Sequence, residues 1–504
     1  MELTLLLFLP LATGLLGAVL GNRLVKPAAV LGGLGTLGVA VGLALNYDTA
    51  LGGSQFTVDK LWVKPLGIHW ALTIDGLNLA LVVLTAFVYA SVVVACAVRE
   101  QENPRLFYFH LGLGASAVLG AFLAQDLILF VLFFDLMLVP FYFLVGQWGT
   151  GERVAATTKM VIYTLAGSLL MLAAAVATGA LAASHHGRHI DFLISNLQRL
   201  PLGKGTQQWI FLCFAAAFLV KMPAVPLHGW LKDAYKSMPL PVLALFSGVL
   251  SKVAAYGFLK LALPLFPDAA ASFQDLLLAI GVISILYGSA LAFTTNDARL
   301  VVGYSSIAQL GFILIGIFSL TSDGAQGALL QMVNHGVVTV ALVMIVGVLA
   351  SRAKGSEDLG SMGGIAMGAP VLAVVFLIAA FANLAMPASA NFIGEFLILK
   401  GVFDSVTVVA VIACLGVAMA AVYMLRAYIR AMHGPDTNGV EQRDLSFREA
   451  LPILPAIALI LALAVSPQPL LKRSEGPATA AVIPAAKAAN IDPIQTATTA
   501  QAKR

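Results

Sequence analysis

The sequence predicts an all-α polytopic membrane protein with about fourteen transmembrane helices, of which the seventh and the twelfth are broken. Of its 504 residues, 60% are hydrophobic and only 11% are charged, whereas a soluble globular protein is about 25% charged. Apolar runs of about 20 residues, the length that crosses a bilayer as a helix, recur along the whole chain. Prolines interrupt two of these runs. The small net charge of +4 provides no basic face for nucleic acid.

Fourteen apolar runs are candidates for membrane spans, with ends uncertain by several residues. They are 2–21, 28–46, 76–98, 106–124, 126–147, 159–183, 208–230, 240–264, 272–293, 299–320, 325–350, 369–403, 406–431 and 449–466. The first run has neither a basic leader nor a clear cleavage site, so we expect a retained helix rather than a signal peptide. The 369–403 run is too long for one straight helix and contains ANLAMPASANF, which predicts a break.

Lysine and arginine in the loops predict the orientation of the chain, because cytoplasmic loops carry an excess of both. Numbered from the N-terminus, each odd loop carries at least one of them. Among the even loops, basic residues occur only in the second and the sixth. The odd loops are therefore expected on the cytoplasmic side, and both termini on the outer side.

The spans divide the chain into five parts. These are helices 1–3 with an outer-side hairpin (residues 1–105, hairpin 55–73), a first repeat of helices 4–8 (106–264), a second, inverted repeat of helices 9–13 (272–431), helix 14 (432–466) and a tail (467–504). The tail is rich in alanine, threonine and proline, so we expect it to be disordered.

Neither the histidines nor the cysteines form a metal-binding pattern. His185, His186 and His189 lie in an outer loop without cysteine or paired carboxylates, which favours a solvated loop over a metal site. The three cysteines each lie alone in an apolar span, as small buried hydrophobic residues do. We expect no cofactor and no metal on this chain.

The seventh span carries the most unusual stretch, WIFLCFAAAFLVKMPAVPLHGWL. Lys221 stands beside Pro223 and Pro226, and a proline inside a helix breaks or kinks it. The pattern Ala-Phe, Met-Pro-Ala, Gly recurs at 380–397, in the twelfth span. Spans five apart run in opposite directions, and inverted repeats with paired broken helices are typical of transporters.

Ionisable residues in the middle of apolar spans are costly and indicate function. Five of them lie on five different spans: Asp135, Lys221, Lys252, His335 and Glu395. The alternative is that they form ion pairs that only hold helices together. Two of the five stand beside helix breaks, which favours the functional interpretation.

Together these residue types are suited to proton transfer. Burial disfavours the charged forms of lysine and of carboxylates, and a nearby opposite charge restores them. A buried Asp–Lys pair can therefore release a proton when its members separate and take one up when they meet. His335 adds a side chain of a type that titrates near neutral pH, and the sequence has no nucleotide-binding or haem motif.

Several blocks of the chain resemble the antiporter-like membrane subunits of respiratory complex I, most closely the subunit M branch of bacterial NADH:quinone oxidoreductase. The matching blocks are QDLILFVLFFDLMLVPFYFLVGQWG (125–149), AFLVKMPAVPLHGWLKDA (217–234), VGYSSIAQLGFILIGIF (302–318), LLQMVNHG (329–336) and ANFIGEFLILKGVF (390–403). The resemblance implies a fourteen-helix subunit with two inverted five-helix repeats. It also implies a bacterial inner-membrane location and proton pumping while other subunits pass electrons from NADH to quinone.

The resemblance also implies a role for each residue of the relay. Asp135 is the acid of the fifth helix, Lys221 the lysine of the broken seventh and Lys252 the connecting lysine of the eighth. His335 is the histidine of the eleventh helix, and Glu395 is the acidic exit residue of the broken twelfth. His228, just after the seventh-helix break, completes the set of candidates. The sequence departs from the family pattern at Asp135, where glutamate is usual, and at Gln309, where histidine is usual.

The expected partners are the lipid bilayer, protons and other membrane subunits of a complex I-like assembly, which would hold NADH, FMN, iron–sulfur clusters and quinone. Two alternatives remain open. One is a subunit of a multi-subunit sodium/proton antiporter or of a membrane hydrogenase. The other is a non-conducting structural paralogue, because Asp135 and Gln309 alter the relay.

Overall fold

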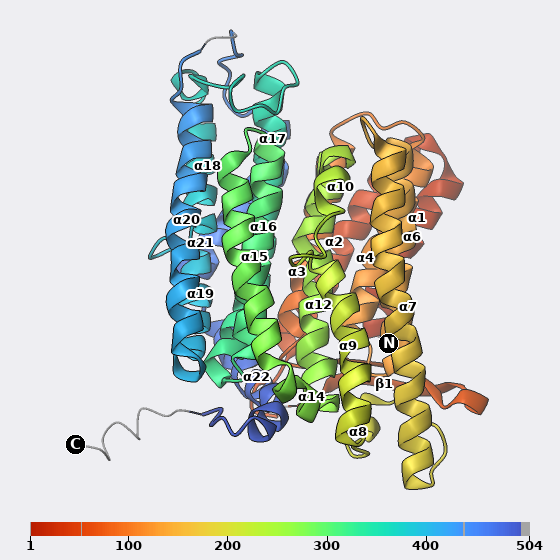
Figure 1. Ribbon diagram of the computed structural model, residues 1–504. Coiled ribbons are helices and arrows are strands. Elements are labelled where there is room, and N and C mark those ends of the chain that lie inside the picture. Colours follow the sequence, from red (N-terminus) through yellow and green to blue (C-terminus); the bar gives the residue numbers. More distant parts are fainter. Residues whose placement is uncertain (1, 52, 437–438, 495–504) are drawn as a thin grey trace.

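The computed structural model describes residues 2–51, 53–436 and 439–494, which form a bundle of long helices with a small hairpin at one end (Figure 1). In this described part, twelve helices are long and apolar enough to cross a membrane. Most are single helices: α1 (Glu2–Leu20), α2 (Asn22–Asn46), α3 (Leu79–Ala97), α4 (Pro104–Leu123), α7 (Arg153–His186), α15 (Gln274–Thr294), α16 (Ala298–Phe318), α17 (Ser322–Arg352), α20 (Thr407–Met432) and α21 (Phe447–Val465).

Two of the twelve are continuous in space but irregular in their hydrogen bonding. The fifth span consists of α5 (Leu127–Leu136) and α6 (Leu138–Trp148), which meet at Met137. The eighth consists of α11 (Leu240–Leu245), η2 (Phe246–Leu250), α12 (Ser251–Gly257), η3 (Phe258–Ala262) and α13 (Leu263–Leu265). Both η2 and η3 are π-helical turns, which leave some backbone carbonyls without their usual helical donors and are frequent at functional sites.

Two further spans are broken in the middle, as the prolines predict. The seventh runs as α9 (Lys204–Lys221), a series of turns and α10 (Leu231–Ser237). The twelfth runs as α18 (Pro370–Asn383), a break around Pro387 and α19 (Ala390–Ser405). With these two added to the twelve, the prediction of fourteen spans with broken helices 7 and 12 is confirmed.

Successive loops lie at alternate ends of the bundle, and segments at the same end contact one another. At one end, Arg299 at the start of α16 pairs with Glu357 in the eleventh loop, and the backbone N–H of Thr150 in the fifth loop donates to the Ser237 carbonyl oxygen. At the opposite end, Gln207 donates to Asp268. Consequently α9 and α18 approach their breaks from opposite ends of the bundle, as expected for inverted repeats.

The remaining short elements cap the ends of the bundle. Strands β1 (Gln55–Val63) and β2 (Ile68–Ile74) pair antiparallel around η1 (Lys64–Leu66), which confirms the predicted hairpin. Gly67 closes the turn with a φ of 64°, and the Ile190 carbonyl oxygen lies 1.9 Å from where a Cβ would stand, so no side chain fits there. The other short elements are α8 (Ile194–Leu197), α14 (Pro267–Ser272) and η4 (Ile365–Met367).

The tail prediction is wrong for residues that the structure describes. Gln468–Ala488 forms a helix, α22, at the same end of the bundle as β1 and α14 (Figure 1). Its buried side chains, Ala478, Ala481, Val482 and Ala485, follow helical spacing, so one small apolar face packs on the bundle. The alanine-rich composition conceals this periodicity. Residues 495–504 of the predicted tail lie outside the described part.

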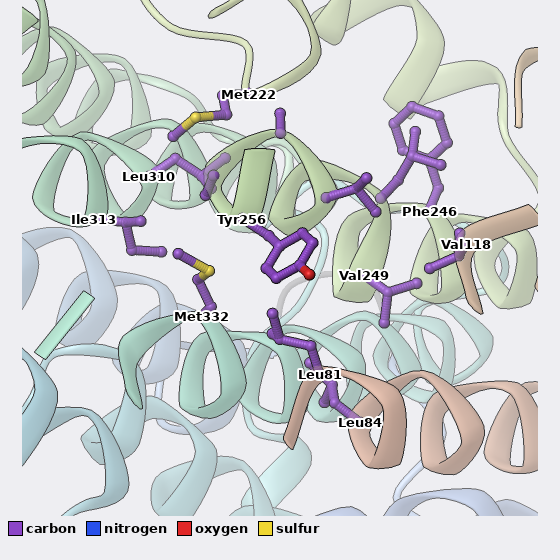
Figure 2. Close-up of a cluster of buried hydrophobic side chains, with 14 of the residues drawn as sticks. Leu81, Leu84, Val118, Met222, Phe246, Val249, Tyr256, Leu310, Ile313 and Met332 are labelled. Carbon is purple, nitrogen blue, oxygen red and sulfur yellow. The ribbon is translucent and has the colours of Figure 1, made fainter. Parts of the chain in front are cut away.

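The centre of the bundle lies where the two repeats meet. Every residue of α16 is buried, as is nearly every residue of α17. Figure 2 shows Tyr256 of α12 among apolar side chains from both halves of the chain. Those labelled around it are Leu81, Leu84, Val118, Met222, Phe246, Val249, Leu310, Ile313 and Met332. The polar groups of the candidate site therefore lie in a closely packed apolar interior.

Candidate functional site

Lys221 lies at the last turn of α9, where Pro223 prevents the helix from continuing. Its side chain is buried, and its ammonium donates a 2.6 Å hydrogen bond to the Phe134 carbonyl oxygen at the end of α5. The same ammonium lies 3.4 Å from the centre of the Phe134 ring, a cation–π contact that offsets part of the cost of desolvation. The break is held by Trp230, whose indole N–H donates to the Val220 carbonyl at 3.1 Å.

Asp135 follows Phe134 directly, so the predicted acid and lysine lie on neighbouring positions. They nevertheless form no ion pair among the described residues, because Lys221 donates to the backbone of the preceding residue. Asp135 Oδ1 is buried without a hydrogen-bond partner. The other side of the carboxyl group interacts with Ser168. A buried carboxylate oxygen without a partner is costly, so Oδ1 is free to accept a further hydrogen bond.

Lys252 and His335 form a second polar group deeper in the bundle, and both are fully buried. Lys252 donates to the Ser247 carbonyl at 2.6 Å, within the π-helical turn η2. His335 Nε2 lies 3.0 Å from Thr339 Oγ1, and its Nδ1 has no partner. Helix α17 and the π-helical turn η2 touch through glycines, since a Cβ on Gly336 of α17 would lie 2.8 Å from the Gly248 carbonyl oxygen of η2.

Glu395 of α19 is the centre of a third group. Gln309 of α16 donates to Glu395 Oε1 at 2.7 Å, and Gln331 of α17 donates to Gln309 Oε1 at 2.6 Å. Gln331 also reaches Glu395 Oε1 at 3.4 Å. The carboxyl group is thus held by amides rather than by a basic side chain.

Comparison with known proteins places these groups in a family context. Residues 124–420 match the family model described as NADH:quinone oxidoreductase/Mrp antiporter, TM. NADH-quinone oxidoreductase subunit M of Escherichia coli (strain K12) is 38% identical over 445 residues, 86% of each chain. The chain belongs to the NADH:quinone oxidoreductase/Mrp antiporter family. NADH-quinone oxidoreductase subunit M of Pseudomonas aeruginosa is 39% identical over 425 residues, covering 83% of this chain and 82% of that one.

A solved structure agrees over nearly the whole length. A chain of respiratory complex I from Thermus thermophilus with bound NADH has a TM-score of 0.88 at 30% identity, covering 96% of this chain and 100% of that chain. The family assignment therefore covers both repeats and helices 1–3, and it confirms the resemblance found in the sequence.

Three buried amide side chains also belong to the site, although they carry no charge that would mark them in the sequence. Gln331 and Asn334 lie on α17 with His335, and Asn391 lies on α19. Gln331 Oε1, Asn334 Oδ1 and both polar atoms of Asn391 are buried without protein partners. Buried polar atoms of this kind are usually satisfied by ordered water. The signal in the sequence is three amide side chains within apolar spans, two of them in the block LLQMVNHG.

His228 lies in the break between α9 and α10 and contacts α15. Its ring packs edge-on against Tyr287 with centroids 5.3 Å apart, and its Nδ1 is buried without a partner. The adjacent Val225 N–H donates to Ser284 Oγ of α15 at 3.0 Å. The seventh-helix break is therefore tied to the second repeat, and His228 lies at that junction.

Basic residues near span ends have structural partners instead. Lys260 pairs with Asp75 at 2.7 Å, and Arg426 donates to the Thr295 carbonyl at 2.9 Å. Lys400 pairs with Asp323. Among the described residues, no group of three or more His, Cys, Asp or Glu side chains has the arrangement of a metal site.

Proposed function

We propose that the chain is a proton-translocating membrane subunit of NADH:quinone oxidoreductase. The observation that carries this proposal is Lys221, a buried lysine at the proline break of α9, in a chain whose relatives are named subunit M of that complex. A lysine buried at such a position is costly, and costly residues of this kind mark ion or proton paths. Partner subunits would bind NADH, FMN, iron–sulfur clusters and quinone, and this chain would carry no redox centre.

The first step of the proposed relay is a switch between Asp135 and Lys221. When Asp135 approaches the ammonium, the charged lysine is stabilised; when it withdraws, the lysine gives up its proton. Two observations support this step: Asp135 Oδ1 has no partner, and Lys221 donates to the carbonyl of the preceding residue, Phe134. A small movement of α5 would therefore replace the Phe134 carbonyl by the Asp135 carboxylate as the acceptor of the ammonium.

The proton would then pass through Lys252 and His335 to Glu395, with His228 as a further candidate at the junction of the repeats. Water would bridge the gaps, since Gln309 and Gln331 do not titrate but can donate and accept hydrogen bonds. The unpartnered atoms of His335, Asn334 and Asn391 support this part of the relay, because each can hold a water molecule.

We further propose that the protein lies in the inner membrane of a bacterial cell with both termini on the outer side. Basic residues in the odd loops support this orientation. The division into helices 1–3, repeats 106–264 and 272–431, and helix 14 is part of the same proposal. The opposed breaks of α9 and α18 support it.

Two alternatives keep the same fold. The family description includes the Mrp antiporter, so a subunit of a sodium/proton antiporter or of a membrane hydrogenase would share the lysine and its break. A non-conducting paralogue would have the fold without the relay. Neighbouring genes for quinone-site, NADH-binding and iron–sulfur subunits would favour the oxidoreductase over the first alternative.

The test is Lys221→Met in the assembled complex, reconstituted in vesicles, with protons pumped per NADH oxidised as the readout. We expect assembly to be normal and pumping to fall strongly. The matched control is Lys159→Met, an exposed lysine paired with Asp233 at 2.8 Å, which should pump as the unmodified complex does. Equal pumping by both variants would support the non-conducting paralogue and refute the proposal.

A further inference from the structure

Two cavities of different character meet beside α22. One is a mainly apolar groove of about 380 Å³ between α3, α17, α21 and α22, lined by side chains such as Phe87, Val337 and Leu463. The other is a cavity of about 780 Å³ that includes Lys260, Lys472 and Asp75. Arg473 lines both. Together they form one amphipathic site with a guanidinium at the boundary.

The two parts lie at different depths of the bundle. Phe87 lies eight residues into α3, so the groove extends about 12 Å along that helix at 1.5 Å per residue. The polar cavity lies at the end of the bundle that carries β1, β2 and α22. The apolar part is thus at the depth of lipid acyl chains, and the basic part is at the level of their headgroups.

The polar cavity carries uncompensated positive charge. Lys260 is neutralised by Asp75 at 2.7 Å. Among the hydrogen bonds and ion pairs of the described residues, none involves the side chain of Lys472 or Arg473. Arg473 is half-buried while Lys472 is exposed, so the guanidinium is the better placed of the two to bind an anion, and its planar donors match the geometry of phosphate.

We propose that this site binds one phospholipid with an anionic headgroup, with an acyl chain in the groove and the phosphate on Arg473. In the proposed orientation this end of the bundle is the outer side, so the headgroup would belong to a lipid of the outer leaflet. The groove is also lined by Val333 and Val337 of α17, which flank His335 in sequence. A bound acyl chain covers the bilayer side of the helix that carries His335. The proposal is independent of whether the chain moves protons.

The test uses the assembled complex in lipid nanodiscs that contain photoactivatable phosphatidylglycerol or, separately, phosphatidylcholine with the same reactive acyl chain. Labelled peptides are mapped by mass spectrometry. Both lipids carry a phosphate, but the choline cation cancels its charge in phosphatidylcholine. Phosphatidylglycerol is therefore expected to label α3 and α21 about fivefold more strongly, the ratio for about 1 kcal/mol per basic side chain at a membrane surface. This comparison needs no variant.

Matched variants then separate the two parts of the site. Arg473→Glu should lower phosphatidylglycerol labelling to the phosphatidylcholine level, while Lys487→Glu, the same charge change at an exposed position of α22 outside both cavities, should not. Leu463→Trp should fill the groove and reduce labelling by both lipids, whereas Leu461→Trp on the exposed face of α21 should not.

Three results would overturn the proposal. Equal labelling by the two lipids, which both carry a phosphate, would mean that the net negative charge of the headgroup is not recognised. Crosslinks from α3 and α21 to a neighbouring subunit instead of lipid would mean that a protein helix fills the groove. Undiminished labelling in Arg473→Glu would remove the assigned role of the guanidinium.

Discussion

The buried carboxyl group of Glu395 has amide side chains as its partners in place of a basic side chain. Glu395 receives hydrogen bonds from the amides of Gln309 and Gln331 on two different helices. The sequence predicted Glu395 because a carboxyl group in an apolar span is costly. It did not predict the two glutamines as its partners, because neutral amides are less costly there and their contacts arise only from the packing of α16, α17 and α19.

Gln309→Leu is expected to lower proton pumping, because it removes the shortest hydrogen bond of a buried carboxyl group, worth about 1.5–3 kcal/mol when the group is charged. Protons pumped per NADH in the reconstituted complex measure this. Gln309→His, which keeps a donor, should retain most of the pumping.

The control for that variant is Gln207→Leu. Gln207 is equally buried, but it bonds to Asp268 and Leu202 at the end of the bundle. This variant should lower the thermal midpoint without changing the pumping ratio. Equal losses of pumping in both variants would show that Gln309 has only a structural role.

Asp135→Asn is expected to abolish most of the pumping, because an amide cannot supply the charge that the proposed switch with Lys221 needs. Asp135→Glu should restore pumping, since the carboxylate is kept and Oδ1 has no protein partner to lose. The same pumping assay decides between these outcomes. Full activity of Asp135→Asn would remove the acid from the relay.

At the scale of elements, prolines made the breaks in spans 7 and 12 predictable, and the hairpin at 55–73 was also expected from the sequence. The π-helical turns η2 and η3 were not predictable, because no residue type requires them. Helix α22 was hidden by its alanine-rich composition. Lys252 donates to the Ser247 carbonyl oxygen in η2, so this hydrogen bond could not be predicted from the sequence.

The contact between η2 and α17 provides a prediction for Gly336. In Gly336→Ala the new methyl group would lie 2.8 Å from the Gly248 carbonyl oxygen and 2.7 Å from Leu84 Cδ2, an overpacking that costs about 1–3 kcal/mol. The thermal midpoint and the pumping ratio should both fall, because α17 is displaced from Lys252. Gly42→Ala, with nothing within 4 Å of its Cβ, should leave both unchanged or raise stability slightly.

At the scale of the whole molecule, α22 ties the end of the chain to the centre of the bundle. It packs on α17 and α14, and Gln326 of α17 donates to the Leu471 carbonyl at 2.9 Å. A chain that ends at Ser466 should therefore assemble poorly or unfold at lower temperature. Native gel analysis of the assembled complex measures this. Normal assembly and an unchanged thermal midpoint would contradict the packing role of α22.

We propose that Lys221 and Glu395, on the two broken spans, lie on one proton path. Effects of groups that act in series are not additive. The decisive measurement is protons pumped per NADH for Lys221→Met, Glu395→Gln and the double variant in the reconstituted complex. One path predicts that the double variant loses no more than the more severe single variant. If each single variant loses a separate share and the double variant loses their sum, the two residues serve independent paths and the claim is contradicted.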